Sequence, residues 1–301
     1  MEAEFVAWLR QRLATHPTTP LGLSDDAALL PVGGQCVITS DLLCDGVHFE
    51  IQRTDFRRIG HKALAVNLSD LAAMAATPQA AFVSLLLPHE ITLKMTQEIY
   101  EGILSLAERY KLAIAGGDTN RWQGALAISI TATGLPMAAG ALTRSQAQVG
   151  DAILVTGQLG GSRLGHHLDF EPRVREASLL HQDYQLHAGM DISDGLTLDL
   201  SRLCEASQVG AELVLDQIPI SASAAQLSLQ TGNSSLNHAL ADGEDFELLF
   251  TMAPNQANKV EEDQPLAIPV TRIGTVIAEA GLWHRDNLGV RQPLQPKGYL
   301  H

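Results

Sequence analysis

Carboxylates that stand where apolar stretches end are the residues of this sequence best suited to chemistry. Asp26 lies in "LSDDAALLP", Asp41 follows "CVITS", and Asp118 follows "LAIAGG". Asp191 and Asp194 form "MDISDGL" just before a helical pattern. Acids placed where strands give way to loops are typical of ligand sites on a rigid scaffold. We therefore expect these side chains to serve a ligand site.

Asp70 is a different case, because it interrupts the helical pattern of "AVNLSDLAAMAA". A buried, unpaired carboxylate costs several kcal/mol, so Asp70 needs a partner. Mg²⁺ prefers oxygen ligands and is commonly shared between one or two carboxylates and the phosphates of a substrate. The acids together indicate a magnesium site, which would also allow an acidic chain to bind a polyphosphate.

Each motif also has an ordinary structural interpretation. The acids of "SDDAA" can cap a helix or form a surface turn, and Ser193 can cap the helix that begins at "LTLDL". Asp70 can simply pair with Lys62 or Asn67, and "GGDT" alone indicates only a turn. His48 can face a ligand or be an ordinary histidine at the end of a strand. The joint occurrence of the motifs favours the ligand site.

Composition and charge limit the possible partners. The chain has 301 residues, nearly half of them hydrophobic, and a formal net charge of −14. That charge argues against nucleic acid and against an anionic membrane as a partner. Three irregularly spaced cysteines, no basic leader followed by an apolar run, and apolar stretches too short to span a bilayer predict a cytoplasmic protein.

Strand-like and helical stretches alternate along the chain, which predicts an α/β or α+β fold. Residues 35–40 and 80–87 have strand character, and residues 59–76 and 93–110 have helical period. A stretch rich in small residues at 136–151 precedes "AILVTG", where strand, glycine loop and helix begin again. We therefore predict two domains, residues 1–137 and 138–301.

Several nucleotide-binding and catalytic signatures are missing from the sequence. It contains no G-x-x-x-x-G-K-[ST] loop, no G-x-G-x-x-G loop and no H-R-D motif, so neither a P-loop enzyme nor a protein kinase is supported. It also has no G-x-S-x-G elbow of a serine hydrolase.

The order of the motifs resembles that of the thiamine-monophosphate kinase family. The likeness rests on "SDDAALLP", "ITSDLLCDGVHF", "GHKALAVNLSDLAAMAATP", "AIAGGDT", "LTRSQAQVGD", "MDISDGLTLDL" and "ADGEDFELLFT". This family belongs to the superfamily of aminoimidazole ribonucleotide synthetase and selenophosphate synthetase. The resemblance implies an N-terminal domain that binds ATP and magnesium and forms a homodimer through its sheet, a C-terminal α/β domain, and an ATP site in the cleft between them.

The resemblance also implies a role for individual residues. Several Mg²⁺ ions would be held, directly, through backbone oxygen or through water, by Asp26, Thr39, Ser40, Asp41, Asp70, Asp118, Asp191 and Asp194. The nucleotide would contact Gly117, Asp118, Arg144, Ser193 and Tyr110. Thiamine monophosphate would face His48, Glu244 and Tyr299. Among these, Asp41, Asp118 and Asp194 are expected to be essential for catalysis.

The activity implied is transfer of the γ-phosphoryl group of ATP to thiamine monophosphate, giving thiamine diphosphate and ADP. The acceptor is a phosphate oxygen that is largely ionised near neutral pH, so no general base is required. The sequence departs from the family pattern at Ser24, where glycine is usual, and near the C-terminus, where Tyr299 or Trp283 would have to replace the usual final aromatic residue. Arg144 could instead form a surface pair with Asp151.

Two alternatives stay open at this stage. The chain could be another ATP-using enzyme of the same superfamily, although it lacks the early cysteine of a selenophosphate synthetase. It could also be a nucleotide-binding module without catalysis, although such a module could lose the acids that this sequence retains.

Overall fold

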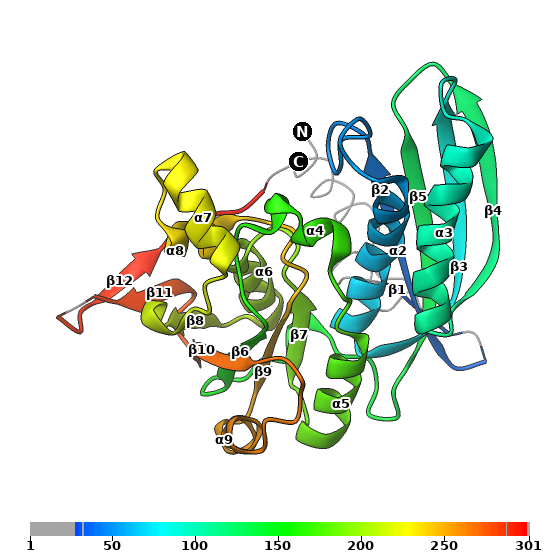
Figure 1. Ribbon diagram of the computed structural model, residues 1–301. Helices are drawn as coiled ribbons and strands as arrows, with labels where there is room; N and C mark the ends of the chain where they lie inside the picture. The colour runs from blue at the N-terminus through cyan, green and yellow to red at the C-terminus, as the bar shows by residue number, and fades with distance from the viewer. Residues whose placement is uncertain (1–27, 32, 287, 300–301) are drawn as a thin grey trace, which may run out of the picture.

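The computed structural model describes residues 28–31, 33–286 and 288–299. Two β-sheets organise these residues, one in each half of the chain (Figure 1). The predicted metal ligand Asp26 lies outside the described residues. The predicted mixture of helices and strands is confirmed.

The first sheet has five strands in the order β1-β2-β5-β3-β4. They are β1 (Ala28–Pro31), β2 (Gln35–Cys44), β3 (Ala76–Pro88), β4 (Ala113–Trp122) and β5 (Ala127–Pro136). The pairs β1–β2, β2–β5 and β3–β5 are antiparallel, whereas β3 and β4 are parallel and are joined by helix α3 (Leu93–Arg109). Buried and exposed residues alternate along β3, as expected for a sheet with one covered face.

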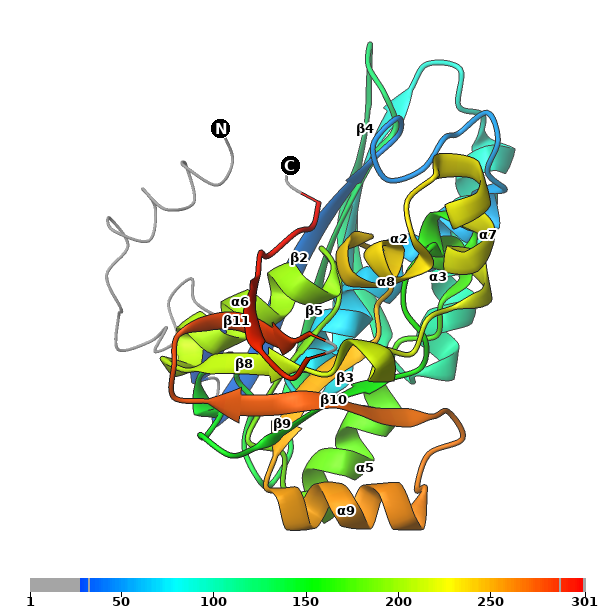
Figure 2. The ribbon, with the colours of Figure 1, turned by 90° about the vertical axis from the view of Figure 1, so that its left-hand side faces the viewer.

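Helices α2 (Phe56–Ala73) and α3 cover one face of this sheet (Figures 1 and 2). The N-cap Asp55 starts α2 by accepting backbone hydrogen bonds from Arg57 and Arg58. The two helices approach closely, since a Cβ added to Gly60 would lie 1.9 Å from the carbonyl oxygen of Ile99. This contact explains why a glycine stands in the middle of a helix.

The second half forms a seven-stranded sheet in the order β12-β11-β8-β10-β6-β9-β7. The strands are β6 (Ala152–Thr156), β7 (Ala188–Asp191), β8 (Gly210–Leu213), β9 (Leu248–Met252), β10 (Val270–Ile277), β11 (Gly281–Arg285) and β12 (Arg291–Leu294). The α-helices of this half are α4 (His166–Asp169), α5 (Val174–Tyr184), α6 (Leu196–Ser207), α7 (Ala222–Thr231), α8 (Ser235–Ala241) and α9 (Pro254–Asp263). Short 3-10 turns lie at Arg144–Gln146, Ser162–Leu164 and Leu215–Gln217.

Helix α2 lies between the first sheet and the second half of the chain (Figure 1). It contacts β2 and β5 on one side and α4, α5 and β7 on the other. Most of its residues are therefore buried, which explains the small and apolar residues all round this helix. The same helix carries Lys62 and Asp70, so these charged groups lie between the two halves of the chain.

Two strands run further than the sequence patterns indicated. Asp41 lies inside β2 and Asp118 inside β4, whereas each was expected just after a strand. In the sheet register, Asp41 aligns through β5 and β3 with Gly117, the residue before Asp118, so the side chains of Asp41 and Asp118 point to opposite faces of the sheet. The division between residues 137 and 138 falls in the segment that joins β5 to the second sheet, and it stays a prediction.

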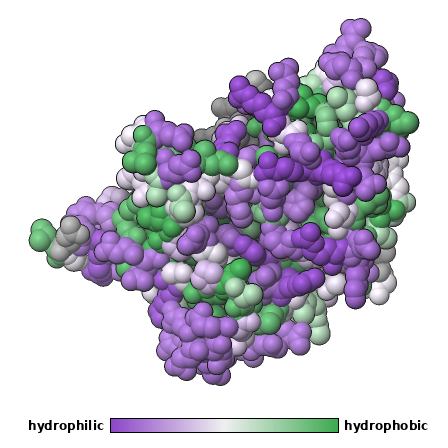
Figure 3. Space-filling model, in the orientation of Figure 1, coloured by the Kyte–Doolittle hydropathy of each residue, from purple (hydrophilic) through white to green (hydrophobic). Residues whose placement is uncertain are grey.

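The surface seen from the side of α3 is mostly hydrophilic, with separate hydrophobic patches (Figure 3). Among the described residues, no helix has both the length and the apolar character needed to cross a membrane.

Candidate active site

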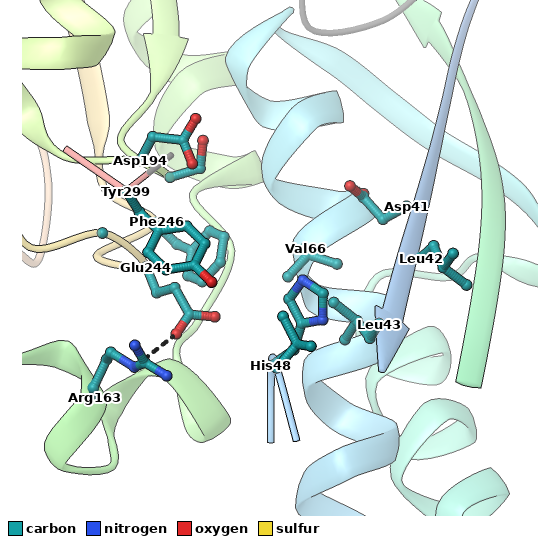
Figure 4. A pocket seen from close by; sticks show the side chains of 13 residues that line it. Asp41, Leu42, Leu43, His48, Val66, Arg163, Asp194, Glu244, Phe246 and Tyr299 are labelled. Carbon is teal, nitrogen blue, oxygen red and sulfur yellow. Dashed lines mark ion pairs between the residues drawn. The ribbon is translucent and has the colours of Figure 1, made fainter. Parts of the chain in front are cut away.

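A cavity of about 310 Å³ lies between the two halves of the chain. Its lining consists of Asp41, Leu42, Leu43, Val47, His48, Val66, Arg163, Ser193, Asp194, Gly243, Glu244, Phe246 and Tyr299. Figure 4 shows Asp41, Val66 and His48 on one wall and Asp194, Glu244 and Tyr299 on the other. The cavity thus brings together the three predicted substrate contacts, two predicted metal ligands and the predicted nucleotide contact Ser193.

The wall formed by the first half consists of the end of β2 and the turn that follows it. Asp45 stabilises this turn by accepting a hydrogen bond from the backbone of Ile51 (2.8 Å). The backbone N–H of Cys44 donates to Nδ1 of His48 (3.0 Å), which fixes the imidazole ring against the end of the strand. Val66 adds an apolar contact from α2 to the same wall.

The opposite wall is a loop at residues 242–247 that leads into β9. Glu244 and Phe246 both adopt positive φ angles, 65° and 51°, which are uncommon for residues other than glycine. Backbone hydrogen bonds hold the loop in this conformation: Glu244 N–H donates to the Ser193 carbonyl (2.7 Å) and Phe246 N–H to the Ile192 carbonyl (2.8 Å). A firmly held, unusual backbone conformation of this kind is common at functional sites.

Buried groups behind the loop support it further. Both carboxylate oxygens of Asp245 accept from the backbone N–H of Gly160 at 3.0 Å, and burial raises the pKa of Asp245 well above its usual range. Phe246 stacks on Phe170 with ring centroids 4.1 Å apart. Glu247 forms a bidentate pair with Arg173. The loop is therefore anchored on the side away from the cavity.

Glu244 is an acid of the cavity that has two cationic neighbours. Its carboxylate forms an ion pair with the buried ammonium group of Lys62, and Arg163 lies 3.8 Å from its other oxygen (Figure 4). Burial lowers the pKa of Lys62, although the charge of Glu244 opposes this shift. Lys62 therefore pairs with Glu244 and not with Asp70, which was one interpretation of the sequence.

Asp194 lies at the turn before α6 and pairs with Arg202 (2.6 Å). The same guanidinium binds the buried Asp199 (2.9 Å), which accepts backbone hydrogen bonds from Asp194 and Gly195. Burial, together with the nearby charge of Asp194, raises the pKa of Asp199 to about 7. The backbone of Asp194 also accepts a hydrogen bond from Tyr299 N–H (2.9 Å), which brings the C-terminal segment to the cavity.

Three further predicted metal ligands lie beside α2. Asp70 accepts a hydrogen bond from the Thr39 hydroxyl, and Asp191 accepts one from the Ser69 hydroxyl (2.6 Å). Asn67, the other partner considered for Asp70, donates instead to the carbonyl of Ala63 (3.2 Å). Within the described part of the chain, no three side chains of His, Cys, Asp or Glu are grouped so that they could hold a metal ion.

Ser40, Gly117 and Asp118 do not line the cavity. Ser40 is exposed and its hydroxyl bonds that of Thr131 (2.9 Å), so only its backbone could turn toward a ligand beside Asp41. Asp118 is exposed on the edge strand β4 and accepts hydrogen bonds from Thr119 N–H (2.8 Å) and Asn120 (2.9 Å). Gly117 permits the close approach of β4 to β3, since an added Cβ would lie 1.9 Å from the carbonyl oxygen of Val83.

Arg144 and Tyr110 also stand apart from the cavity lining. Arg144 lies in the turn before β6, and its carbonyl accepts a hydrogen bond from Ser207 (2.5 Å). Asp151, the surface partner considered for Arg144, pairs with His187 (2.9 Å). Tyr110 ends α3, and its buried hydroxyl donates to Glu171 and to the carbonyl of Pro172, so burial and the hydrogen bond to Glu171 raise its pKa.

Sequence reasoning missed several residues of this site, chiefly Lys62, Val66, Arg163 and Phe246. Lys62, Val66 and Asp70 recur at intervals of four residues, which places them on one face of α2. That spacing could have indicated from the sequence that the three residues share one helix face. Arg163 follows the glycine-rich stretch "GQLGG", but no spacing links it to Glu244, which is 81 residues later.

The two halves of the chain match two domains of one protein family. Residues 24–136 match the N-terminal domain of AIR synthase related proteins, and residues 142–285 match their C-terminal domain. The HypE hydrogenase maturation protein from E. coli is similar in fold, with a TM-score of 0.74 at 18% identity and coverage of 99% of both chains. The chain belongs to the AIR synthase related family.

Closer relatives define the branch of that family. The thiamine-monophosphate kinase of Rhodopirellula baltica is 44% identical and covers 100% of this chain and 97% of its own length. The one from Bacillus subtilis is 32% identical, covering 91% of each chain. The structure of AaThiL complexed with AMPPCP and TMP matches with a TM-score of 0.80 at 27% identity, covering 99% of this chain and 96% of its own. The chain belongs to the thiamine-monophosphate kinase family.

Proposed function

We propose that the chain transfers the γ-phosphoryl group of ATP to thiamine monophosphate, giving thiamine diphosphate and ADP, in the cavity between its two halves. Membership of the thiamine-monophosphate kinase family makes the chain a phosphotransferase. One observation carries the assignment of the site: His48 and Glu244, from opposite halves, line one cavity together with Asp41 and Asp194 (Figure 4).

The walls of the cavity suit the acceptor. Leu43, Val66 and Phe246 supply apolar surface against which a flat heterocycle can pack, and Tyr299 can cover it from the C-terminal segment. Glu244 offers a carboxylate to the positive charge of a thiazolium ring. The volume of about 310 Å³ falls in the range of small-molecule sites.

The predicted magnesium ligands fit this metal by their chemistry, since all of them offer oxygen. Asp41, Asp70, Asp191 and Asp194 belong to the cavity wall or to the α2 region beside it, and Thr39 and Ser40 directly precede Asp41 on β2. Asp26 and Asp118 would complete the set. Bound magnesium would neutralise the charge of the phosphates and hold them in line. Mg²⁺ is commonly shared between protein carboxylates and substrate phosphates. The separate positions of these carboxylates agree with that arrangement, in which phosphate oxygens would fill the remaining coordination positions of the metal.

The chain's own residues have three tasks in this reaction. Asp41 and Asp194, on opposite walls of the cavity, would hold magnesium at the phosphate end, which would fix the approach of the two phosphates to each other. Glu244 and His48 orient the acceptor at the other end of the cavity. The apolar wall excludes water, which limits hydrolysis of ATP. No side chain needs to remove a proton, because the attacking oxygen belongs to an ionised phosphate.

The nucleotide contacts stay predictions. Ser193 supports them because it lines the cavity, and Arg144 offers a guanidinium that matches phosphate oxygens. Gly117 and Asp118 lie on an exposed strand that a nucleotide can reach. Tyr110 has the weakest support, because its hydroxyl is already bound to Glu171 and Pro172.

The exposed face of the first sheet supports a homodimer. Leu42, Phe82, Leu86 and Leu135 point away from α2 and α3 and are 40–57% exposed. Apolar side chains gathered on one uncovered sheet face are typical of an interface between subunits. Phe82→Glu should convert a dimer to a monomer in size-exclusion chromatography with light-scattering detection. Leu104→Glu, on the solvent face of α3, should leave the dimer intact. A monomeric wild-type chain at micromolar concentrations would refute this proposal.

A division into residues 1–137 and 138–301 remains our proposal for the domains, and it agrees with one sheet in each part. The predicted cytoplasmic location has support from the three cysteines, all of which are unpaired thiols.

The proposed activity is tested by incubating the purified chain with Mg-ATP and thiamine monophosphate and following thiamine diphosphate. Asp41→Asn should lower turnover about 100-fold or more, the range seen when one charge-stabilising group is removed. Asp183→Asn, an exposed acid on α5, is the matched control and should keep wild-type turnover. ADP release with other acceptors only would indicate a different superfamily activity, and ATP binding without any product would indicate a non-catalytic module.

A further inference from the structure

Lys62 is a fully buried lysine in the middle of α2, a helix between the two halves of the chain. Its ammonium group donates to the carbonyl oxygen of His48 (2.7 Å) and forms an ion pair with Glu244. His48 belongs to the first half and Glu244 to the second. One positive charge therefore connects the backbone of His48 with the side chain of Glu244, the two residues that are expected to contact the acceptor.

The backbone of Glu244 is already fixed without Lys62. Its N–H donates to the Ser193 carbonyl (2.7 Å), and its carbonyl accepts from the Ser162 hydroxyl (2.5 Å). What remains free is the direction of the carboxylate. The buried ammonium group of Lys62 holds Oε1 of Glu244. Nε of Arg163, whose side chain is 59% exposed, lies 3.8 Å from Oε2. The buried partner is better placed to set that direction, because exposed pairs contribute little.

The turn that carries His48 depends on the same ammonium group. The imidazole Nδ1 accepts from Cys44 N–H (3.0 Å), and the His48 carbonyl accepts from Lys62. Because the ring and the carbonyl are both held, the turn has a single arrangement against α2. Lys62 thus reaches both walls of the cavity without being part of its lining.

We propose that Lys62 is a positioning residue that holds the carboxylate of Glu244 and the His48 turn in the geometry needed to receive the acceptor. This inference rests on the proposed function for its kinetic consequences. It extends that function by naming the group that connects the two halves of the acceptor site. Lys62 acts through Glu244 and His48 and does not touch the reacting phosphates.

The kinetic test compares Lys62→Met with Lys259→Met, an exposed lysine on α9 that serves as the matched control. Loss of a charged hydrogen bond that orients a binding group should raise the KM for thiamine monophosphate about 10- to 100-fold. The KM for ATP and kcat should change less than about threefold. A purely structural lysine would instead lower kcat and weaken both substrates together, and that result would overturn the proposal.

A double substitution tests whether Lys62 acts through Glu244. If it does, Lys62→Met combined with Glu244→Gln should raise the KM for the acceptor no further than Glu244→Gln alone. If the fold-changes in the KM for the acceptor instead multiply in the double variant, the two residues act independently, and this result would contradict the proposal.

Stability provides a readout that does not depend on the activity. Glu244→Ala leaves a buried ammonium group without its counter-charge, whereas Lys62→Met leaves a carboxylate that is 20% exposed and still lies near Arg163. Glu244→Ala should therefore lower the melting temperature more than Lys62→Met, and the double variant should melt near Lys62→Met. Any other order of the melting temperatures would overturn the inferred contact between Lys62 and Glu244. The expected order without any thiamine diphosphate formation would instead refute only the proposed function.

Discussion

Substitution of Arg173 should show how strongly the stability of the protein depends on the buried ion pair that anchors the loop at residues 242–247. Arg173 is 11% exposed and Glu247 3% exposed, and the guanidinium meets the carboxylate with Nε–Oε2 and Nη2–Oε1 distances of 2.7 and 2.5 Å. Breaking a buried pair by removing one partner typically costs about 3–5 kcal/mol of unfolding free energy, because a buried charge is left alone. We expect Arg173→Met to lie at the lower end of this range, since Thr156 still donates to Glu247 (2.6 Å).

Urea unfolding at neutral pH and one fixed protein concentration measures this loss of unfolding free energy. Arg175→Met, which removes an exposed arginine in the first turn of α5, two residues after Arg173, should change the unfolding free energy by less than about 1 kcal/mol. The combined variant Arg173→Met with Glu247→Leu should recover most of the loss, because neither charge remains buried. A loss for Arg173→Met that is below about 1 kcal/mol would refute the reasoning.

Three further predictions concern packing, thiol reactivity and helix capping. Gly102→Ala should lower the melting temperature by several degrees, because its Cβ would lie 2.0 Å from the carbonyl oxygen of Arg57; a variant as stable as wild type would contradict this contact. Cys204, whose pKa burial raises to about 12, should resist an aromatic disulfide reagent at pH 8 in the native protein and react once urea unfolds it. Thr92→Ala should cost about 1 kcal/mol of unfolding free energy in urea, because the hydroxyl accepts from Met95 N–H at the start of α3; an unchanged midpoint would argue against this cap.

The sequence predicted the elements of the fold better than their ends. The helix expected at residues 59–76 is α2 at Phe56–Ala73, and the alternating strand at 80–87 lies within β3. The patterns missed that β2 and β4 continue past their acids, because pairing with neighbouring strands can hold a polar residue in a strand. Pairing partners are far apart in sequence, and local periodicity cannot reveal them.

For the candidate site too, local sequence patterns identified single residues but not the partners that are distant in sequence. Acids, histidine and glycine turns could be picked out from their local context, and His48, Glu244 and Tyr299 meet at one cavity. The partner of each group could not be found in this way. The sequence allowed Lys62 to pair with Asp70, eight residues away on the same helix, but Lys62 pairs with Glu244, 182 residues away. Only the packing of α2 against the second half makes that pair possible.

The hydroxyl groups of Thr39 and Ser69 explain how an acidic site can fold without strong destabilisation. Each donates to a carboxylate next to the cavity, Thr39 to Asp70 and Ser69 to Asp191. A buried carboxylate that lacks any donor would cost several kcal/mol, so these hydroxyls stabilise the acids within the protein itself. A magnesium ion that uses the same oxygens must displace the hydroxyl protons, which can rotate away about a single bond. The two hydroxyl donors thus stabilise these acids in the folded chain, and the helix that carries Ser69 and Asp70 is also the helix that carries Lys62.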